Sequence, residues 1–162
     1  RLQEIVATTD GIVAWQQIDV DSADAHKEDK TAPYPGMVDC VARLKAAGVN
    51  MAVLTNKADP MAGPVVNAYY PGLFPTVQGA LPGMPTKPDP TLLHKLMERM
   101  NATRENTLFV GDSNVDIRTA KNGGLTGCGV LWGFRSRQEL ETEGADVLVQ
   151  TPEELERVIL GQ

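Results

Sequence analysis

The stretch Leu108-Phe109-Val110-Gly111-Asp112-Ser113-Asn114-Val115-Asp116 decides the fold of this chain. Its apolar run rises into a glycine, which predicts a buried parallel strand, and residues 115–120 predict the start of a helix. Ligands bind at the carboxyl ends of strands in open α/β sheets, so we expect Asp112 and Asp116 to face one crevice. Two carboxylates repel each other there unless a cation lies between them, and Mg²⁺ prefers such oxygens. A solvated turn with an acidic helix cap is the alternative interpretation.

Polar side chains follow a second predicted strand, at residues 49–54. Thr55, Asn56 and Lys57 supply a hydroxyl, an amide and an amine at its carboxyl end. Groups of this kind suit phosphate oxygens. An ordinary turn is the alternative here, because a Thr-Asn pair alone is weakly diagnostic.

A proline-rich loop, Pro85-Thr86-Lys87-Pro88-Asp89-Pro90, brackets a lysine. Pro88 disfavours the helical region for Lys87. Pro90 suits the first turn of a following helix, with Asp89 as its cap. Lys87 is therefore expected on a stiff loop, where its ammonium can neutralise a phosphate or an aspartate. Most single lysines are solvated, but few are restricted in this way.

Strands and helices alternate from residue 36 onward. We expect helices over residues 37–47, 91–100 and 116–122, and a further helix that begins at Asp59-Pro60 and that Pro64 limits or kinks. Capping boxes at residues 136–139 and 151–154 predict the start of two more helices. Further strands are expected at residues 76–78, 129–132 and 146–149. This alternation indicates an α/β protein with a doubly wound, Rossmann-like parallel sheet over residues 33–162.

Composition narrows the possible partners. The 162 residues suffice for one domain, and the net charge of −6 argues against a nucleic-acid partner. No apolar run approaches the ~20 residues of a membrane span. Cys40 and Cys128 are expected as buried thiols, and His26 and His94 as surface or structural residues. We expect a cytoplasmic monomer or dimer that attracts a small anion through local charge.

Leu54-Thr55-Asn56, Lys87-Pro88-Asp89-Pro90 and Gly111-Asp112-Ser113-Asn114-Val115-Asp116, in that order, resemble the motifs of the haloacid dehalogenase (HAD) superfamily. Tyr34-Pro35-Gly36 and Thr55-Asn56-Lys57 look most like its phosphoglycolate phosphatase-like branch. The resemblance covers about residues 30 to 160. It implies a HAD-like core and Mg²⁺-dependent hydrolysis of a small phosphorylated metabolite through an aspartyl-phosphate.

The resemblance also implies a role for each matching residue. Thr55, with Asn56, would bind the transferring phosphoryl group. Lys87 would steady the nucleophile and the charge of the phosphate. Asp112 would ligate Mg²⁺, and Asp116 would support the metal directly or through water.

The first motif of the family is where this sequence departs from the pattern. That motif is an apolar strand ending in Asp-x-Asp-Gly-Thr, whose first Asp is the nucleophile and whose second is the general acid/base. The nearest match is Ile5-Val6-Ala7-Thr8-Thr9-Asp10-Gly11-Ile12, with Thr8 at the nucleophile position and Asp10 at the acid/base position. A threonine without a base is a poor nucleophile, so we expect no appreciable turnover by this chain alone.

Two accounts of the N-terminal region follow. In the first, which we favour, the chain is a fragment and residues 1–32 are a cap remnant with its linker. In the second, residues 3–11 form a degenerate first strand with almost no cap. The first account leaves a gap between the strands that end at Thr55 and Asp112, and something must fill it.

Three functions therefore remain open from the sequence. The leading one is a phosphatase of a small phosphorylated metabolite. The second is a catalytically dead relative that binds phosphate and metal. The third is a flavodoxin-like signalling domain, which has the same kind of sheet and an acidic pocket. In such a domain the phospho-accepting Asp should end a strand without the Gly-Asp-Ser-x-x-Asp pattern, which weakens this alternative.

Overall fold

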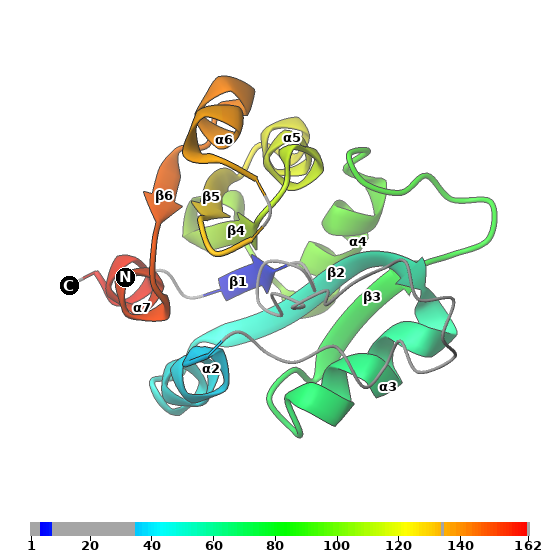
Figure 1. The fold of residues 1–162 in the computed structure, drawn as a ribbon. Coiled ribbons are helices and arrows are strands. Elements are labelled where there is room, and N and C mark those ends of the chain that lie inside the picture. Colours follow the sequence, from blue (N-terminus) through cyan, green and yellow to red (C-terminus); the bar gives the residue numbers. More distant parts are fainter. Residues whose placement is uncertain (1–3, 8–34, 134, 162) are drawn as a thin grey trace, which may run out of the picture.

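The computed structural model describes residues 4–7, 35–133 and 135–161 of the chain. Within them, six strands form one parallel sheet in the order β3-β2-β1-β4-β5-β6 (Figure 1). The strands are β1 (Glu4–Ala7), β2 (Asn50–Ala58), β3 (Thr76–Ala80), β4 (Thr107–Gly111), β5 (Thr126–Val130) and β6 (Val147–Val149). This order is that of a doubly wound sheet, so the predicted fold class is confirmed.

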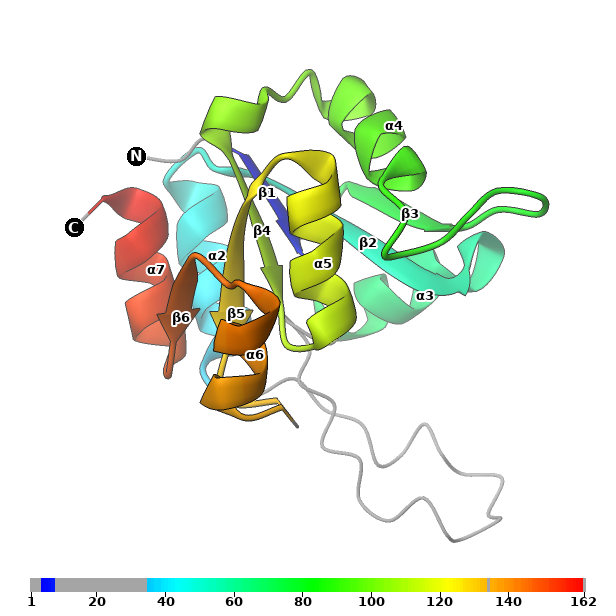
Figure 2. The ribbon, with the colours of Figure 1, turned by 90° about the horizontal axis from the view of Figure 1, so that it is seen from above.

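Helices cover both faces of this sheet. They are α2 (Met37–Ala46), α3 (Asp59–Tyr69), α4 (Thr91–Met100), the short 3₁₀ helix η2 (Arg104–Asn106), α5 (Asn114–Gly123), α6 (Arg137–Glu143) and α7 (Pro152–Leu160). Figure 1 shows α2, α3 and α7 below the sheet and α5 and α6 above it. In the view from above, α4, α5 and α6 lie over the strands (Figure 2).

Strand β1 occupies the centre of the sheet. Glu4 pairs with Asn50 of β2 on one side and with Thr107 of β4 on the other, and the register continues to Ala7. Residues 4–7 thus fill the position between β2 and β4 that the account of a missing first strand leaves empty. The sheet reverses its direction of winding at β1, and a doubly wound sheet binds its ligands at such a switch point.

The core has two layers because the inner strands are buried on both faces. The larger cluster lies between the sheet and α2, α3 and α7, and its fully buried large side chains include Met37, Leu44, Tyr70, Leu108 and Ile159. The smaller cluster lies under α4 and α5 and includes Leu54, Leu93, Leu96 and Phe109. Leu108 and Phe109 of β4 enter opposite layers, as the two-residue period of a strand requires.

Three helices begin at side-chain caps. The capping residues are Ser113 for α5, Ser136 for α6 and Thr151 for α7. Each hydroxyl accepts a hydrogen bond of 3.2 Å from the backbone N–H three residues further on. Ser136 and Thr151 therefore cap helices at the positions that the sequence predicts, because each satisfies an amide that the helix leaves without a partner. The reciprocal bond of a complete capping box is found at α5, where Asp116 Oδ2 accepts from the N–H of Ser113.

Three elements differ from the sequence prediction. Strand β2 continues past Leu54 to Ala58. Helix α3 continues through Pro64 to Tyr69, so of the two predicted alternatives, the one in which Pro64 limits the helix is wrong. Val66 packs α3 onto the core, and this burial outweighs the weak helix propensity of proline. Strand β5 lies at Thr126–Val130 and not at 129–132, because its glycines carry no strand signal in the sequence. Gly127 and Gly129 leave room there for side chains of neighbouring elements.

Cys40 and Cys128 are free and buried, as expected. Burial raises the pKa of the Cys40 thiol to about 11 and that of Cys128 to about 12. Neither thiol is therefore a nucleophile near neutral pH. Among the described helices, none is both long and apolar enough to cross a bilayer.

Candidate active site

The predicted site residues meet at the carboxyl end of β4, the strand predicted from the apolar run, and the cluster of Lys87, Asp112 and Asp116 is called the crevice below. All five residues of β4 are buried, and Asp112 follows the strand directly with 7% of its surface exposed. Asp116 lies in the first turn of α5 and is 1% exposed. Its Oδ2 accepts hydrogen bonds from the backbone N–H of Asp112 at 3.1 Å and of Ser113 at 3.3 Å. The Asp116 carboxylate thus folds back over the turn that carries Asp112.

Lys87 forms an ion pair with Asp116. The Lys87 Nζ lies 2.9 Å from Asp116 Oδ1, and the two side chains are 9% and 2% exposed. The loop and the acidic turn, predicted separately from the sequence, therefore meet in one place. With both oxygens of Asp116 engaged by hydrogen bonds, this residue holds the lysine in the crevice.

Two asparagines hold the Lys87 loop from opposite sides. Asn56 Oδ1 accepts a hydrogen bond from Lys87 N–H at 3.1 Å, and Asn56 Nδ2 donates to the Lys87 carbonyl at 3.5 Å. Asn122, near the end of α5, donates through Nδ2 to the carbonyl of Pro88 at 2.9 Å. The sequence pattern assigns Asn56 to phosphate, and here its amide engages the backbone of Lys87. Asn122 is not predicted from the sequence, because no motif includes it.

Asp89 ties the other end of the same loop to α4. Its Oδ1 accepts a hydrogen bond from the N–H of Thr91, the first residue of α4, at 2.8 Å. The N-cap position itself is taken by Pro90, one residue later than the sequence predicts. Hydrogen bonds from Thr91 lower the pKa of the Asp89 carboxyl below its ordinary value. The carboxylate therefore stays charged, and its negative charge stabilises the N-terminus of α4.

Thr55 lies in β2 beside Asn56 and is 5% exposed. Its Oγ1 accepts a hydrogen bond from the backbone N–H of Lys57 at 3.1 Å. Hydrogen bonds connect Asn56 to Lys87, Lys87 to Asp116 and Asp116 to the backbone of Asp112. Hydrogen bonds thus link four predicted site residues, with Thr55 next to the first of them in the chain.

The fit of Mg²⁺ to these residues depends on the oxygens present. No group of three or more His, Cys, Asp or Glu side chains is placed to hold a metal ion in the described part of the chain. The turn contains Asp112, Asp116 and the Asn114 Oδ1, which is buried without a hydrogen-bond partner among the described residues. Mg²⁺ is typically held by one or two carboxylates with waters and substrate phosphates. The residues fit such a hydrated ion better than a cage made of protein ligands alone.

Some residues singled out in the sequence do not enter this geometry. Thr8 and Asp10, which match the first motif of the family, lie outside the described residues, as do His26 and most of the segment 1–32. His94 lies on α4 with Nε2 3.3 Å from the carbonyl oxygen of Gly123, which is a structural position as expected.

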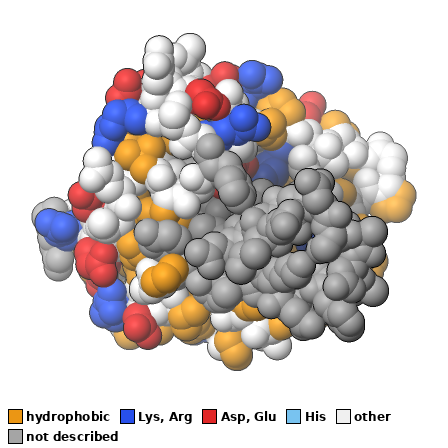
Figure 3. All heavy atoms as spheres, in the orientation of Figure 1, with side chains coloured by type: hydrophobic (Ala, Val, Ile, Leu, Met, Phe, Trp, Pro, Cys, Tyr) orange, Lys and Arg blue, Asp and Glu red, His pale blue; other side chains and the backbone are white. Residues whose placement is uncertain are grey.

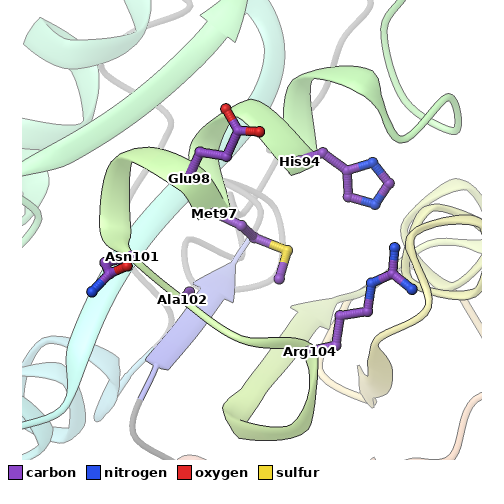
Figure 4. A pocket seen from close by; sticks show the side chains of 6 residues that line it. All are labelled: His94, Met97, Glu98, Asn101, Ala102 and Arg104. Atoms are coloured by element: carbon purple, nitrogen blue, oxygen red, sulfur yellow. The ribbon is translucent and has the colours of Figure 1, made fainter.

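A hollow lies near the amino end of β4, away from the crevice. It measures about 420 Å³ and is lined by His94, Met97, Glu98, Asn101, Ala102 and Arg104 (Figure 4). Arg104 belongs to η2, which precedes β4, so this hollow is at the amino end of the strand and away from Asp112. Figure 4 shows His94 and Arg104 extending on the same side, with Met97 between them.

Charges outside the crevice do not form one patch on the visible face. Figure 3 shows Lys and Arg side chains of the described residues interspersed with Asp and Glu. With a net charge of −6, attraction of an anion has to come from local groups such as Lys87.

The fold and the crevice define a class of protein: a doubly wound α/β domain with a buried lysine and acidic residues at its switch point. The chain belongs to the haloacid dehalogenase-like hydrolase family, whose sequence model matches residues 5–130. The matched range includes residues 5–7 of β1 and every residue of the crevice described above.

Relatives of this chain are named as phosphatases. It is 31% identical to a phosphoglycolate phosphatase of Pseudomonas putida over 126 residues, which are 77% of this chain and 46% of that protein. It is also 31% identical to a phosphoglycolate phosphatase of Escherichia coli K12, covering 79% of this chain and 51% of that one. The chain thus spans about half the length of these curated relatives.

A solved structure agrees with these relatives. The fold matches a Lactobacillus delbrueckii subsp. bulgaricus protein, whose assignment as a phosphoglycolate phosphatase is itself provisional, with a TM-score of 0.79 and 35% identity. The match covers 85% of this chain and 59% of that one. Similarity at this level supports the HAD-like fold and the phosphoglycolate phosphatase-like branch.

Proposed function

We propose that this protein is a Mg²⁺-dependent phosphatase of small phosphorylated metabolites, with phosphoglycolate as the first substrate to test. The observation that carries the proposal is the buried pair of Lys87 and Asp116 beside Asp112. A cation whose side chain is mostly buried, as that of Lys87 is, is a strong electrostatic partner for a phosphoryl group. The relatives named phosphoglycolate phosphatases supply the substrate class. A cytoplasmic location and a monomeric or dimeric state remain predictions from the sequence.

Each residue of the crevice has a proposed role. Lys87 stabilises the negative charge of the transferring phosphoryl group, and the Thr55 hydroxyl donates a hydrogen bond to one of its oxygens. Asp116 and Asn56 keep Lys87 in place through the contacts described above. Asp112 holds Mg²⁺, which when bound supplies positive charge to the phosphate oxygens. Phosphoryl transfer depends mainly on such positioning and charge stabilisation.

The nucleophile separates this proposal from a second one. An aspartyl-phosphate requires a carboxylate at the position that Thr8 occupies. A hydroxyl without a base attacks phosphorus poorly. Thr8 therefore favours a second candidate function, that of a relative that binds phosphate and Mg²⁺ without turnover. Asp10 stands at the acid/base position of the same motif, and it can serve in that role only if Thr8 stands in for the missing aspartate.

One pair of measurements decides between the two candidates. The purified chain is assayed with phosphoglycolate and with p-nitrophenyl phosphate, with and without Mg²⁺, and its binding of inorganic phosphate is measured by calorimetry. Mg²⁺-dependent turnover near ~1 s⁻¹, within the ordinary range of enzymes, establishes the phosphatase. Phosphate binding that disappears in Lys87→Met, without turnover, establishes the second candidate. Absence of both turnover and binding refutes both.

A matched pair of variants then locates the missing chemistry. Thr8→Asp restores the carboxylate that the first motif of the family carries, and Thr9→Asp places the same group one residue away as a control. If the aspartyl-phosphate route applies, Thr8→Asp raises turnover and Thr9→Asp does not. Equal turnover of both variants and the unchanged chain would show that the hydrolysis uses another nucleophile.

A further inference from the structure

Gly133 lies in the turn between β5 and α6, outside every motif discussed above. Its backbone is not in the left-handed region that favours glycine, so conformation does not demand glycine here. Space does. A Cβ at residue 133 would lie 2.6 Å from Asp112 Cβ and 2.9 Å from Asp112 Cγ, and nearer still to the carboxylate Oδ2. The Asp112 side chain thus occupies the room that a side chain of residue 133 would need.

Both partners of this contact are tied to the fold. Asp112 directly follows β4, in which every residue is buried. The turn is fixed before Gly133 by the N–H of Leu131, which donates to the carbonyl of Val149 at 2.9 Å, and by Trp132, which packs against the larger core cluster. Rotation of the Asp112 side chain does not move its Cβ, so a methyl group at residue 133 is expected to push the whole of Asp112, carboxylate included, away from the turn.

The same relation recurs at the second aspartate of the crevice. A Cβ at Gly111 would lie 2.5 Å from Asp116 Cγ and 2.6 Å from Asp116 Oδ2. Each carboxylate therefore lies close to a glycine: Asp116 to Gly111, which is inside the acidic motif, and Asp112 to Gly133, which is in the loop after β5. Because two separate glycines each face an aspartate side chain in this way, close packing of glycine against carboxylate is part of the architecture of the crevice.

We propose that Gly133 is a positioning residue for Asp112, because its missing side chain gives the carboxylate the place from which it meets Mg²⁺. The metal part of this inference rests on the proposed function. Mg²⁺ demands near-ideal octahedral geometry with short bonds. Displacing a carboxylate that holds it is therefore expected to weaken binding, as loss of an orienting partner does in other metal sites.

Calorimetric titration with Mg²⁺ tests the metal part on the 162-residue chain. Gly133→Ala should weaken Mg²⁺ binding by about 10- to 100-fold. Gly63→Ala is the matched control, because Gly63 lies in α3 with no neighbouring atom within 4 Å of the place its Cβ would take, and it should leave the affinity unchanged. Gly133→Ala should add no further loss in an Asp112→Asn background. An affinity that Gly133→Ala leaves at the level of Gly63→Ala, or a further loss beside Asp112→Asn, would overturn the inference.

Thermal unfolding without metal tests the steric part alone. Overpacking in Gly133→Ala should lower the Tm by about 3 °C or more. Asp112→Gly removes the side-chain atoms that a residue-133 methyl would meet, so adding Gly133→Ala to Asp112→Gly should cost much less. If the unchanged chain binds no Mg²⁺, the metal role in the proposed function fails, and this cycle still decides whether Gly133 makes room for Asp112. An equal loss of Tm in both backgrounds would show that it does not.

Discussion

The two sides of helix α5 carry ion pairs of similar length and different surroundings. On the crevice side, Asp116 meets Lys87 at 2.9 Å with side chains 2% and 9% exposed. On the outer side, Arg118 meets Glu143 at 2.7 Å with side chains 51% and 21% exposed. The outer pair is the shorter one, so distance alone does not measure what a pair contributes. Burial and additional hydrogen bonds do.

The supporting contacts make the difference clear. Asp116 also accepts two backbone hydrogen bonds, and the loop of Lys87 is held by Asn56 and Asn122. For the outer pair, the Arg118 side chain lowers the pKa of the Glu143 carboxyl, first through their hydrogen bond, but water surrounds both groups. Removing one partner inside the crevice leaves a charge that water does not reach, whereas removing one partner outside does not.

The largest effect on stability is expected for Lys87→Met. This variant keeps most of the apolar stem and leaves Asp116 as a buried charge, which should lower the free energy of unfolding by about 3 kcal/mol. Urea denaturation measures it, with Lys95→Met on the exposed side of α4 as the control. The double variant Lys87→Met, Asp116→Asn should cost less than the sum of its single variants. If the losses of unfolding free energy in the two single variants simply added up in the double variant, Lys87 and Asp116 would not interact, and the proposed difference between the two sides of α5 would be wrong.

Asp112→Asn should change ligand binding more than stability. The amide preserves the shape of the side chain beside Gly133 but removes the charge that attracts Mg²⁺. We expect Mg²⁺ affinity to fall at least about tenfold, with a urea midpoint close to that of the unchanged chain. Unchanged affinity in calorimetry would show that Asp112 is not the metal ligand of this crevice.

A smaller effect is expected when the Lys87 loop loses a support. Asn56→Ala and Asn122→Ala each remove hydrogen bonds to the loop backbone and should cost about 1 kcal/mol of stability. Asn67→Ala is the control, because Asn67 Oδ1 accepts a comparable bond from the N–H of Gly72 far from the loop. Phosphate affinity should fall in the first two variants and not in the third. Equal phosphate affinity in all three would mean that the asparagines do not position Lys87.

The smallest effect belongs to the outer pair. Arg118→Ala should change the urea midpoint only slightly, and added salt should remove even that change, because exposed pairs are screened. The folded-state pKa of Glu143 is below its ordinary value of 4.5. Its contribution is thus present above about pH 4.5 and lost as pH falls through the folded pKa. A loss as large as that of Lys87→Met at neutral pH would remove the distinction between the two sides of α5.

The candidate site residues of the crevice could be predicted from the sequence, whereas the residues that support them could not. Lys87, Asp112 and Asp116 follow from strand ends and proline positions, which are local signals. Asn122 reaches the loop only because α5 passes beside it, and no local pattern records that contact. Gly133 is similar, because its glycine is needed for space beside another strand.

The elements show the same division. The apolar run at residues 108–110 and the capping residues Ser136 and Thr151 predict their elements correctly, since hydrophobicity and capping act locally. The prediction for β5 is displaced because Gly127 and Gly129 suit packing against neighbouring side chains and not strand propensity. Pro64 does not limit α3 for the related reason that burial of this helix is a tertiary property.

The central place of β1 has a consequence for synthesis on the ribosome. Residues 4–7 leave the exit tunnel before either neighbour, and their partners in β2 and β4 begin at Asn50 and Thr107. Pairing with β2 becomes available first, and one edge of β1 then remains open while residues 54–106 are added. An open strand edge is a template for pairing with other chains. The growing chain, more than the finished sheet, is therefore the state in which this protein is most exposed to aggregation.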